Sequence, residues 1–196
     1  MAYSKLILRG LIGIASVALF APANAGQWDI VLNGKALHVD ADKNWNESNW
    51  GLGFEHEFNP EDRWVRMALG NGFLDSMDQM SYMGGGGIKR RFRLPVGQRR
   101  VHVDLGAIGF IMTRRDVDNN RPFPGILPAI SVGTRQFALN LTYLPGRFAE
   151  QVAGARSADP GLDGILYLQF KLNSRLLSYG ASLGPVSDSF AANRLR

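Results

Sequence analysis

The 196-residue chain has no cysteine, and this absence removes several kinds of chemistry at once. Without thiols there is no disulfide, no thiolate nucleophile and no thiolate metal site. After the N-terminal region, no stretch approaches the roughly 20 apolar residues that a membrane-spanning helix requires. Histidine occurs only three times. The run Gly84–Gly87 is not followed by Gly-Lys-Ser/Thr, which excludes a phosphate-binding loop.

The first 25 residues have the three parts of a secretory signal peptide. These are a basic start at Lys5 and Arg9, an apolar run over 11–20 and a small-residue cleavage site at Ala23-Asn24-Ala25. The alternative, an uncleaved anchor, requires a longer apolar run. We therefore expect residues 1–25 to be a signal peptide and the mature chain to begin at Gly26.

Removing this segment takes away two basic residues and no acidic one, which leaves a mature net charge of about +3. A nucleic-acid partner is not expected for an exported chain with so small an excess of positive charge. The local basic clusters fit anionic lipid phosphates better.

The mature chain alternates apolar and polar residues with the period of two that is typical of β-strands. In residues 137–144, one face carries Phe137, Leu139, Leu141 and Tyr143, and the other carries Ala138, Asn140 and Thr142. Eight strands are expected, near 28–39, 49–59, 63–73, 80–92, 98–113, 126–134, 136–144 and 164–173. Their lengths are near or above the roughly 9–11 residues that a tilted membrane-spanning strand needs.

The expected connections alternate between long and short. Long or polar loops fall at 40–48, 74–79, 114–125 and 145–163, and short turns fall at 59–62, 94–97 and 134–135. Charged strand residues such as Glu57 and Lys171 would cost a few kcal/mol on a lipid-facing surface, so they are expected inside. A soluble β-sandwich or lipocalin-like barrel is the alternative, but its strands would turn their polar residues outward.

These patterns predict an all-β fold, an eight-stranded antiparallel transmembrane β-barrel with long outer loops and short periplasmic turns. The barrel is expected over residues 26–173, in a bacterial outer membrane, and residues 174–196 form a C-terminal extension. A closed barrel satisfies its own strand edges, so a monomer is expected. Six basic residues flank the second periplasmic turn, where a solvated or headgroup-facing rim is the expected role: Lys89, Arg90, Arg91, Arg93, Arg99 and Arg100.

Among the histidines, only His38 falls at the outer end of a strand, and Asp75-Ser76 begins the next outer loop. A histidine, a hydroxyl and a carboxylate at one rim suit acyl transfer, because imidazole can take a proton from an attacking hydroxyl. The ordinary alternative is that Asp75 and Ser76 only form a turn. The sequence shows no metal-binding cluster and no cofactor motif, so neither a metal nor a cofactor is expected.

Proline and glycine are placed unusually in the expected strands. Pro128 and Pro145 lie on neighbouring strands near the same rim, and each lacks an N–H for the ladder. They either end their strands or open a slot in the wall for lateral lipid access. The glycines at 84–87 either allow close strand packing or leave space in the lumen.

Several of these stretches resemble the PagP family of lipid A palmitoyltransferases. They are Pro122-Phe123-Pro124-Gly125-Ile126-Leu127-Pro128-Ala129-Ile130-Ser131-Val132-Gly133, Leu141-Thr142-Tyr143-Leu144-Pro145-Gly146, Phe73-Leu74-Asp75-Ser76, and Leu37-His38 followed by Trp50-Gly51-Leu52-Gly53-Phe54. The resemblance implies an outer-membrane barrel that moves a palmitoyl chain from a phospholipid to a hydroxyl of lipid A. It also implies catalytic roles for His38, Asp75 and Ser76.

The same resemblance makes Arg115 a secondary substrate-binding candidate and places Gly87 at the floor of the acyl pocket. Pro128 and Pro145 match the lateral gap of the family, whereas Asn33 and Asn49 stand where a second gap is flanked by prolines. The expected partners are lipid A as acceptor and a phospholipid as donor. Two alternatives stay open at this stage: a non-catalytic adhesin or envelope-stabilising barrel, and an outer-membrane lipase or deacylase.

Overall fold

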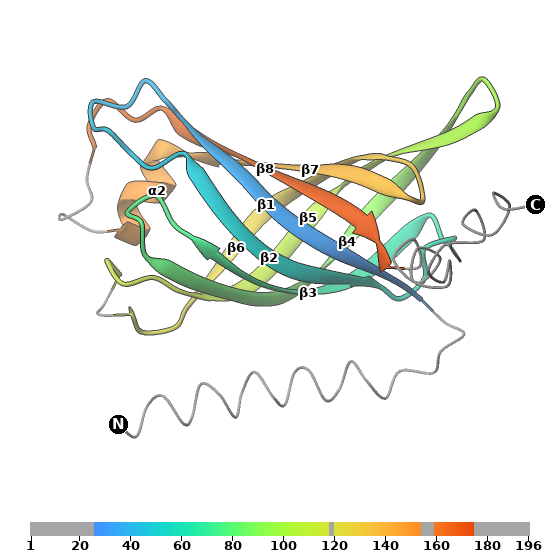
Figure 1. The fold of residues 1–196 in the computed structure, drawn as a ribbon, viewed down its shortest axis with the longest axis horizontal. Coiled ribbons are helices and arrows are strands. Elements are labelled where there is room, and N and C mark those ends of the chain that lie inside the picture. The colour runs from blue at the N-terminus through green and yellow to red at the C-terminus, as the bar shows by residue number, and fades with distance from the viewer. Residues whose placement is uncertain (1–25, 118–119, 154–158, 175–196) are drawn as a thin grey trace, which may run out of the picture.

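The computed structural model describes residues 26–117, 120–153 and 159–174. The predicted signal peptide, 1–25, and the predicted extension beyond residue 174 lie outside these ranges. In the described chain, eight strands form a closed barrel in which each strand pairs antiparallel with its neighbours (Figure 1). The predicted all-β, eight-stranded antiparallel barrel is therefore confirmed.

The strands follow the alternating segments closely. They are β1 (Gln27–Val39), β2 (Ser48–Glu57), β3 (Trp64–Leu74), β4 (Met80–Val96), β5 (Arg99–Thr113), β6 (Phe123–Gly133), β7 (Phe137–Pro145) and β8 (Gly164–Asn173). A short helix, α2 (Gly146–Ala153), follows β7 and was not predicted. No helix in the described ranges is long and apolar enough to span a bilayer.

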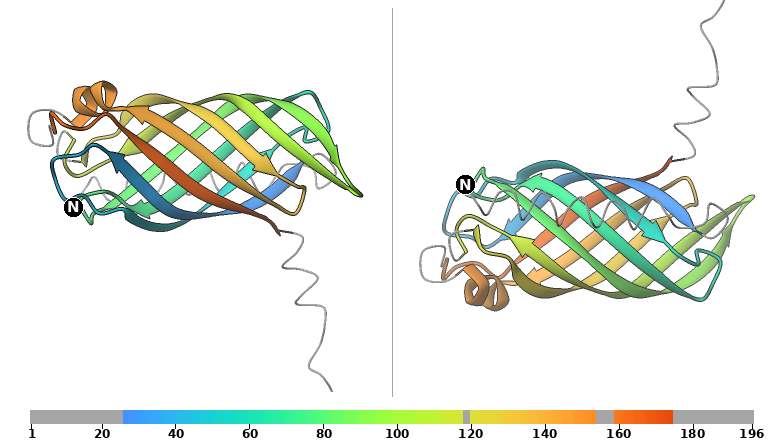
Figure 2. Two further views of the ribbon diagram at one scale, coloured as in Figure 1. Left: turned by 90° about the horizontal axis from the view of Figure 1, so that it is seen from above. Right: turned by 90° about the horizontal axis from the view of Figure 1, so that it is seen from below.

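The two ends of the barrel differ as the connection lengths predicted. The end that we call the loop end carries residues 40–47, 75–79, 114–117, 120–122, 146–153 (α2) and 159–163 (Figure 2). The opposite turn end carries residues 58–63, 97–98 and 134–136, together with the start of β1 and the end of β8. The candidate catalytic residues therefore belong to one end of the barrel.

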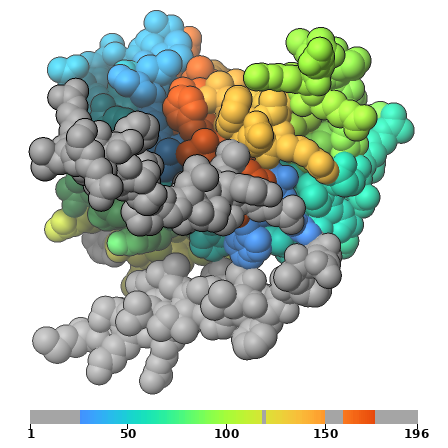
Figure 3. All heavy atoms as spheres, turned by 45° about the vertical axis from the view of Figure 1, so that its right-hand side comes forward, coloured from blue at the N-terminus to red at the C-terminus, as the bar shows by residue number. Residues whose placement is uncertain are grey.

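Two strands begin or end differently from the prediction. The β4–β5 hairpin continues to a turn at 97–98, where Gly97 adopts a positive φ of 58°, and the hairpin projects at the turn end (Figure 3). β6 begins at Phe123 instead of near 126, because its first residues pair with β5. Pro124 is tolerated there, since no β7 residue pairs with this part of β6.

The wall is apolar outside, and charged strand residues point inside. The most exposed large apolar side chains point outward from the strands, among them Trp50 at 69 % and Ile126 at 77 % exposure. Glu57 and Lys171 are buried in the lumen, as the alternation predicted. A lipocalin-like or sandwich protein has the reverse pattern, so the arrangement fits a protein of a bacterial outer membrane.

Aromatic side chains gather at both ends of this apolar wall. Exposed rings near the loop end are Trp50, Tyr82, Tyr143 and Phe148, and those near the turn end are Phe58, Trp64, Phe92, Phe137 and Phe170. Two aromatic girdles around an apolar band are typical of membrane barrels, because the rings favour the bilayer interfaces.

Candidate active site

The loop half of the barrel encloses an apolar cavity of about 700 Å³. Apolar residues from β5 to β8 make most of its wall, and Phe148 and Ala149 of α2 cover part of it. Asp75 and Ser76 are among its few polar lining residues. The cavity therefore offers an apolar ligand a site that reaches the loop carrying the predicted catalytic pair.

This cavity lies beside an interruption in the barrel wall. β6 and β7 are paired only from Ile130 opposite Leu141 to Gly133 opposite Ala138. Toward the loop end the ladder between them stops. There a side-chain hydrogen bond of 3.2 Å from Thr142 Oγ1 to the Pro128 carbonyl crosses the boundary between the two strands, which we call the β6–β7 seam. Pro128 and Pro145 both lie in the unpaired part and both line the cavity.

His38 and Ser76 meet at the loop end. His38 is the penultimate residue of β1, and Ser76 lies in the loop that follows β3, so the pairing of β2 between these strands brings them together. His38 Nε2 and Ser76 Oγ share a hydrogen bond of 3.0 Å. An imidazole nitrogen at this distance from a hydroxyl can take up or return a proton.

Asp75 is close to this pair in sequence, but its carboxylate binds its own loop. It accepts hydrogen bonds from the backbone N–H groups of Met77 (2.9 Å) and Gln79 (3.0 Å), and from the Ser81 hydroxyl (2.9 Å). Within the described chain, no hydrogen bond joins Asp75 to His38. The carboxylate orders the turn that presents Ser76, as the turn hypothesis proposed, and a catalytic role for the pair stays a prediction.

The orientation of the His38 ring depends on the loop 40–47 instead. The Trp45 ring stacks on it, with ring centroids 5.5 Å apart and an angle of 15° between the planes. Asn46 fixes Ser76 from the same loop, because its N–H donates to the Ser76 carbonyl (3.0 Å) and its side-chain amide to the Asp75 carbonyl (3.3 Å). Sequence reasoning missed Trp45 and Asn46, since neither belongs to a catalytic residue type.

The basic loop between β5 and β6 has two arginines with different surroundings. Arg115, the predicted substrate-binding residue, is exposed and donates to Gln79 Oε1 (2.9 Å), which ties this loop to the loop of Ser76. Arg114 lines the apolar cavity and is paired with Asp116 at 2.9 Å. Of the two, Arg114 is the one that borders the cavity.

Gly87 lies in β4, where it pairs with Ile108 of β5. A Cβ added there would collide with the Ala107 carbonyl oxygen of β5, and one added at Gly85 would collide with that of Gly109. These inward-facing glycines therefore allow β4 and β5 to approach closely, as the packing hypothesis proposed. Gly87 does not line the 700 Å³ cavity, and its place at the acyl-pocket floor stays a prediction.

A polar belt closes the cavity toward the middle of the barrel. Asn33 Oδ1 accepts hydrogen bonds from Tyr167 Oη (2.7 Å), Gln169 Nε2 (2.6 Å) and Asn71 Nδ2 (2.9 Å). Below this belt lies a second cavity of about 40 Å³, which shares Leu127, Thr142 and Tyr167 with the larger one. The Tyr167 ring is thus part of the boundary between the two spaces.

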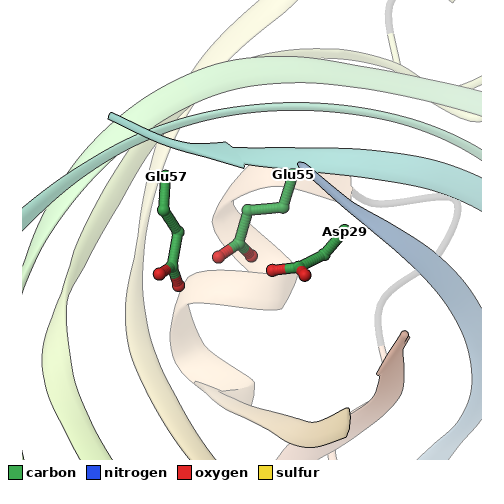
Figure 4. Close-up of side chains that lie close together, drawn as sticks. All are labelled: Asp29, Glu55 and Glu57. Atoms are coloured by element: carbon green, nitrogen blue, oxygen red, sulfur yellow. The ribbon is translucent and has the colours of Figure 1, made fainter. Parts of the chain in front are cut away.

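The turn half of the lumen is filled by ionised side chains. Asp29, Glu55 and Glu57 point their carboxylates toward one another, with oxygens within 4.8 Å (Figure 4). Lys171 Nζ contacts all three, at 3.2, 2.6 and 3.1 Å. An ammonium therefore occupies the position that a metal ion would take among these carboxylates.

Two further cations complete this cluster and correct one prediction. Lys89 Nζ lies 2.8 Å from Glu55 and 2.6 Å from Glu57, and Arg91 forms two hydrogen bonds with Asp104 (2.8 and 2.7 Å). Both residues were expected on a solvated or headgroup-facing rim, but both are buried. The reason is the strand period, which points alternate residues of β4 into the lumen.

The sequence of this barrel is similar to that of a known protein family. Residues 24–153 match the family model described as "Antimicrobial peptide resistance and lipid A acylation protein PagP". The chain belongs to the PagP family.

Curated relatives agree with this membership. A protein named lipid A acyltransferase PagP from Bordetella pertussis (strain Tohama I) is 32% identical over 129 residues, which cover 63% of this chain and 69% of that protein. Proteins of the same name from Methylobacillus flagellatus and Klebsiella pneumoniae are each 33% identical. Those matches cover 55% and 53% of this chain, and 58% and 54% of the relatives.

Proposed function

We propose that this protein is an outer-membrane acyltransferase that moves a palmitoyl chain from a glycerophospholipid to a hydroxyl of lipid A. The observation that carries the proposal is the apolar cavity beside the unpaired half of the β6–β7 seam, with Ser76 in its lining and His38 bonded to Ser76. Membership of the PagP family and relatives named lipid A acyltransferase support the same reaction.

In the proposed binding step, the donor acyl chain enters the cavity from the bilayer between β6 and β7. Pro128 and Pro145 keep this passage free of ladder hydrogen bonds, because neither has an N–H to donate. The polar headgroup then stays at the loop end, where Arg114 and Arg115 can bind phosphate oxygens. The donor ester is thereby brought toward His38 and Ser76.

In the proposed chemical step, a lipid A hydroxyl attacks the carbonyl carbon of the donor ester. His38 Nε2 takes the hydroxyl proton as the new C–O bond forms, and it returns that proton to the glycerol oxygen as the old C–O bond breaks. The products are acylated lipid A and a lysophospholipid. Ser76 orients the imidazole and the reacting groups, and Asp75 holds the turn that carries Ser76.

We further propose that residues 1–25 are removed on export, that the barrel works as a monomer in the outer membrane, and that residues 174–196 form an extension outside the barrel. The closed β1–β8 sheet supports the monomer, because seven of its eight seams and half of the remaining one are paired.

The function is tested by expressing the wild type, His38→Ala and Ser76→Ala in an outer-membrane host that lacks the activity. Mass spectrometry of lipid A should show one added palmitoyl chain for the wild type and a loss of most of it in both variants. His102→Gln, which changes an imidazole at the turn end, is the matched control and should retain the activity.

Folding of every variant is checked by its mobility on gels with and without heating. Unchanged lipid A with the folded wild type would favour a non-catalytic barrel. Release of free fatty acid without any increase in lipid A mass would favour a lipase or deacylase.

A further inference from the structure

Asp159 is a buried carboxylate that joins two outer loops distant in sequence. It lies between α2 and β8 and is fully buried, with 0 % exposure. Its oxygens accept hydrogen bonds from the backbone N–H groups of Asp42 (3.0 Å) and Lys43 (3.1 Å), and from the Trp45 indole N–H (2.8 Å). One side chain of the loop before β8 thus accepts hydrogen bonds from three donors of the loop 40–47.

The charge on Asp159 suits this role. Burial disfavours the ionised form, but the hydrogen bonds from Trp45 and the backbone amides hold the pKa of the Asp159 carboxyl below its ordinary value. The stabilisation that comes from an ionised carboxylate with a lowered pKa is complete at any pH above the ordinary pKa of the group. It is lost only as the pH falls through the lower pKa of the folded state. At neutral pH Asp159 is therefore ionised and can accept all three hydrogen bonds.

The loop that Asp159 holds is the loop that orients His38. Trp45 donates its indole N–H to Asp159 and stacks its ring on the His38 imidazole. His38 Nδ1 is buried and has no hydrogen-bond partner among the described residues, so no carboxylate sets the ring angle in the way that a triad acid does. The stacking of Trp45 and the hydrogen bond to Ser76 are two of the contacts that hold the ring, and the backbone of Ala36 interacts with it as well.

We propose that Asp159 is a positioning residue: by anchoring the loop 40–47 through Trp45, it holds the His38 imidazole at hydrogen-bonding distance from Ser76. The kinetic consequence rests on the proposed acyl transfer, whereas the effect on the His38 ring does not. Removing the carboxylate leaves the three donors of this partly buried contact without their acceptor, which favours a different loop position. A displacement of about 1 Å at a catalytic group costs up to about 100-fold in rate.

The test compares Asp159→Ala, Asp159→Asn and Trp45→Phe in the full chain. Asp163→Ala is the matched control, because Asp163 is an exposed carboxylate of the same loop. We expect kcat for acyl transfer to fall roughly 10- to 100-fold in Asp159→Ala, with little change in KM. Asp159→Asn keeps one acceptor oxygen and Trp45→Phe keeps part of the ring stack, so both should fall less, and Asp163→Ala should match the wild type.

Imidazole NMR signals provide a readout that does not depend on activity. The chain has three histidines, His38, His56 and His102, so each signal can be assigned by substitution. In Asp159→Ala and Trp45→Phe the His38 signal should move, while those of His56 and His102 at the turn end should not. If Asp159→Ala does not fold, kcat and the His38 signal are measured in Asp159→Asn and Trp45→Phe alone.

The outcomes separate this inference from the proposed function. An unchanged His38 signal together with an unchanged kcat in the Asp159 variants would overturn the positioning role. A shifted His38 signal in a protein that shows no acyl transfer even as the wild type would overturn the function and leave the positioning role standing. Movement of all three histidine signals would also overturn the positioning role, because such a change would indicate a general loss of packing.

Discussion

At the loop end the barrel interior is apolar and contains a cavity, whereas at the turn end it is filled by charged side chains that form ion pairs. The loop half holds a cavity of about 700 Å³ and a seam without ladder pairs. The turn half holds four buried carboxylates (Asp29, Glu55, Glu57 and Asp104) and three buried cations (Lys89, Arg91 and Lys171). The halves share the same eight strands but contain opposite kinds of side chain.

The difference indicates a division of labour along one barrel. A cavity and an open seam lower stability, because apolar side chains around them lose packing and the backbone loses hydrogen bonds. The ion cluster ties β1, β2, β4, β5 and β8 together at the other end, where no ligand space is needed. The turn half can therefore hold the wall together while the loop half keeps its cavity and its unpaired seam.

The largest effect is expected from breaking the turn half. Lys171→Met removes the ammonium that contacts Asp29, Glu55 and Glu57, and it leaves their charges with fewer partners. We expect the free energy of unfolding in detergent micelles, measured by urea titration, to fall by roughly 3–5 kcal/mol. Arg99→Met, at an exposed arginine beside the β4–β5 turn, should change it little, and equal losses in the two variants would contradict a role for the cluster.

The second prediction closes the loop half. Continuing the β6–β7 register beyond Ile130 and Leu141 sets Pro128 opposite Tyr143, so a disulfide between Pro128→Cys and Tyr143→Cys would bridge the open seam. The chain has no other cysteine. We expect the oxidised double variant to lose most acyl transfer and to regain it on reduction, because the acyl chain can no longer pass between the strands.

The matched control for this cross-link uses the paired part of the same seam. Val132 and Leu139 are register partners there. A disulfide between cysteines at these positions should leave acyl transfer unchanged. Full activity of the oxidised Pro128→Cys/Tyr143→Cys protein would rule out lateral access through this seam.

The third prediction concerns the wall next to the ion cluster. Gly87→Ala sets a Cβ against the β5 backbone, whereas an outward Cβ at Gly109 meets only the Gly86 carbonyl oxygen at 3.9 Å. We expect Gly87→Ala to lower the free energy of unfolding by about 1–3 kcal/mol through overpacking. Gly109→Ala should stay near the wild type, and equal stability of both variants would contradict the close approach of the two strands.

The smallest effect is expected at the boundary between the two cavities. Tyr167→Ala removes the ring that both cavities share and so deepens the space below the polar belt. Lipid A mass spectra should then show acyl chains longer by a few methylenes at similar yield. Tyr167→Phe keeps the ring and should keep the wild-type chain length; an unchanged length in Tyr167→Ala would assign the floor elsewhere, with Gly87 the remaining candidate.

Much of the fold could be predicted because barrel strands convert sequence order directly into position. Alternate residues face opposite sides, so Trp50 and Glu57 could be assigned to the outer and inner faces without any structure. The same rule, applied to residues 89–91, would have placed Lys89 and Arg91 inside. Reading those residues as a basic cluster hid the alternation, and that prediction was wrong.

The candidate site was predictable only in part. Strand order brought His38 and Ser76 to one end, and the structure joins them at 3.0 Å. The partners of the Asp75 carboxylate could not be predicted, because a side chain in a turn can bind either its own backbone or a neighbouring loop. The helix α2 was missed as well, because its eight residues were treated only as part of the loop 145–163, although their apolar and polar residues follow a helical period.

By itself the sequence determined a closed eight-stranded barrel, its apolar exterior, the inward position of charged strand residues such as Glu57 and the end at which His38, Asp75 and Ser76 gather. Those properties depend on a period of two and on the order of the connections, both of which are local. Only the tertiary structure decided that Asp159 holds Trp45 and that Lys171 lies among three carboxylates. Such contacts join residues more than 100 positions apart, and their geometry exists only once the sheet has closed around them.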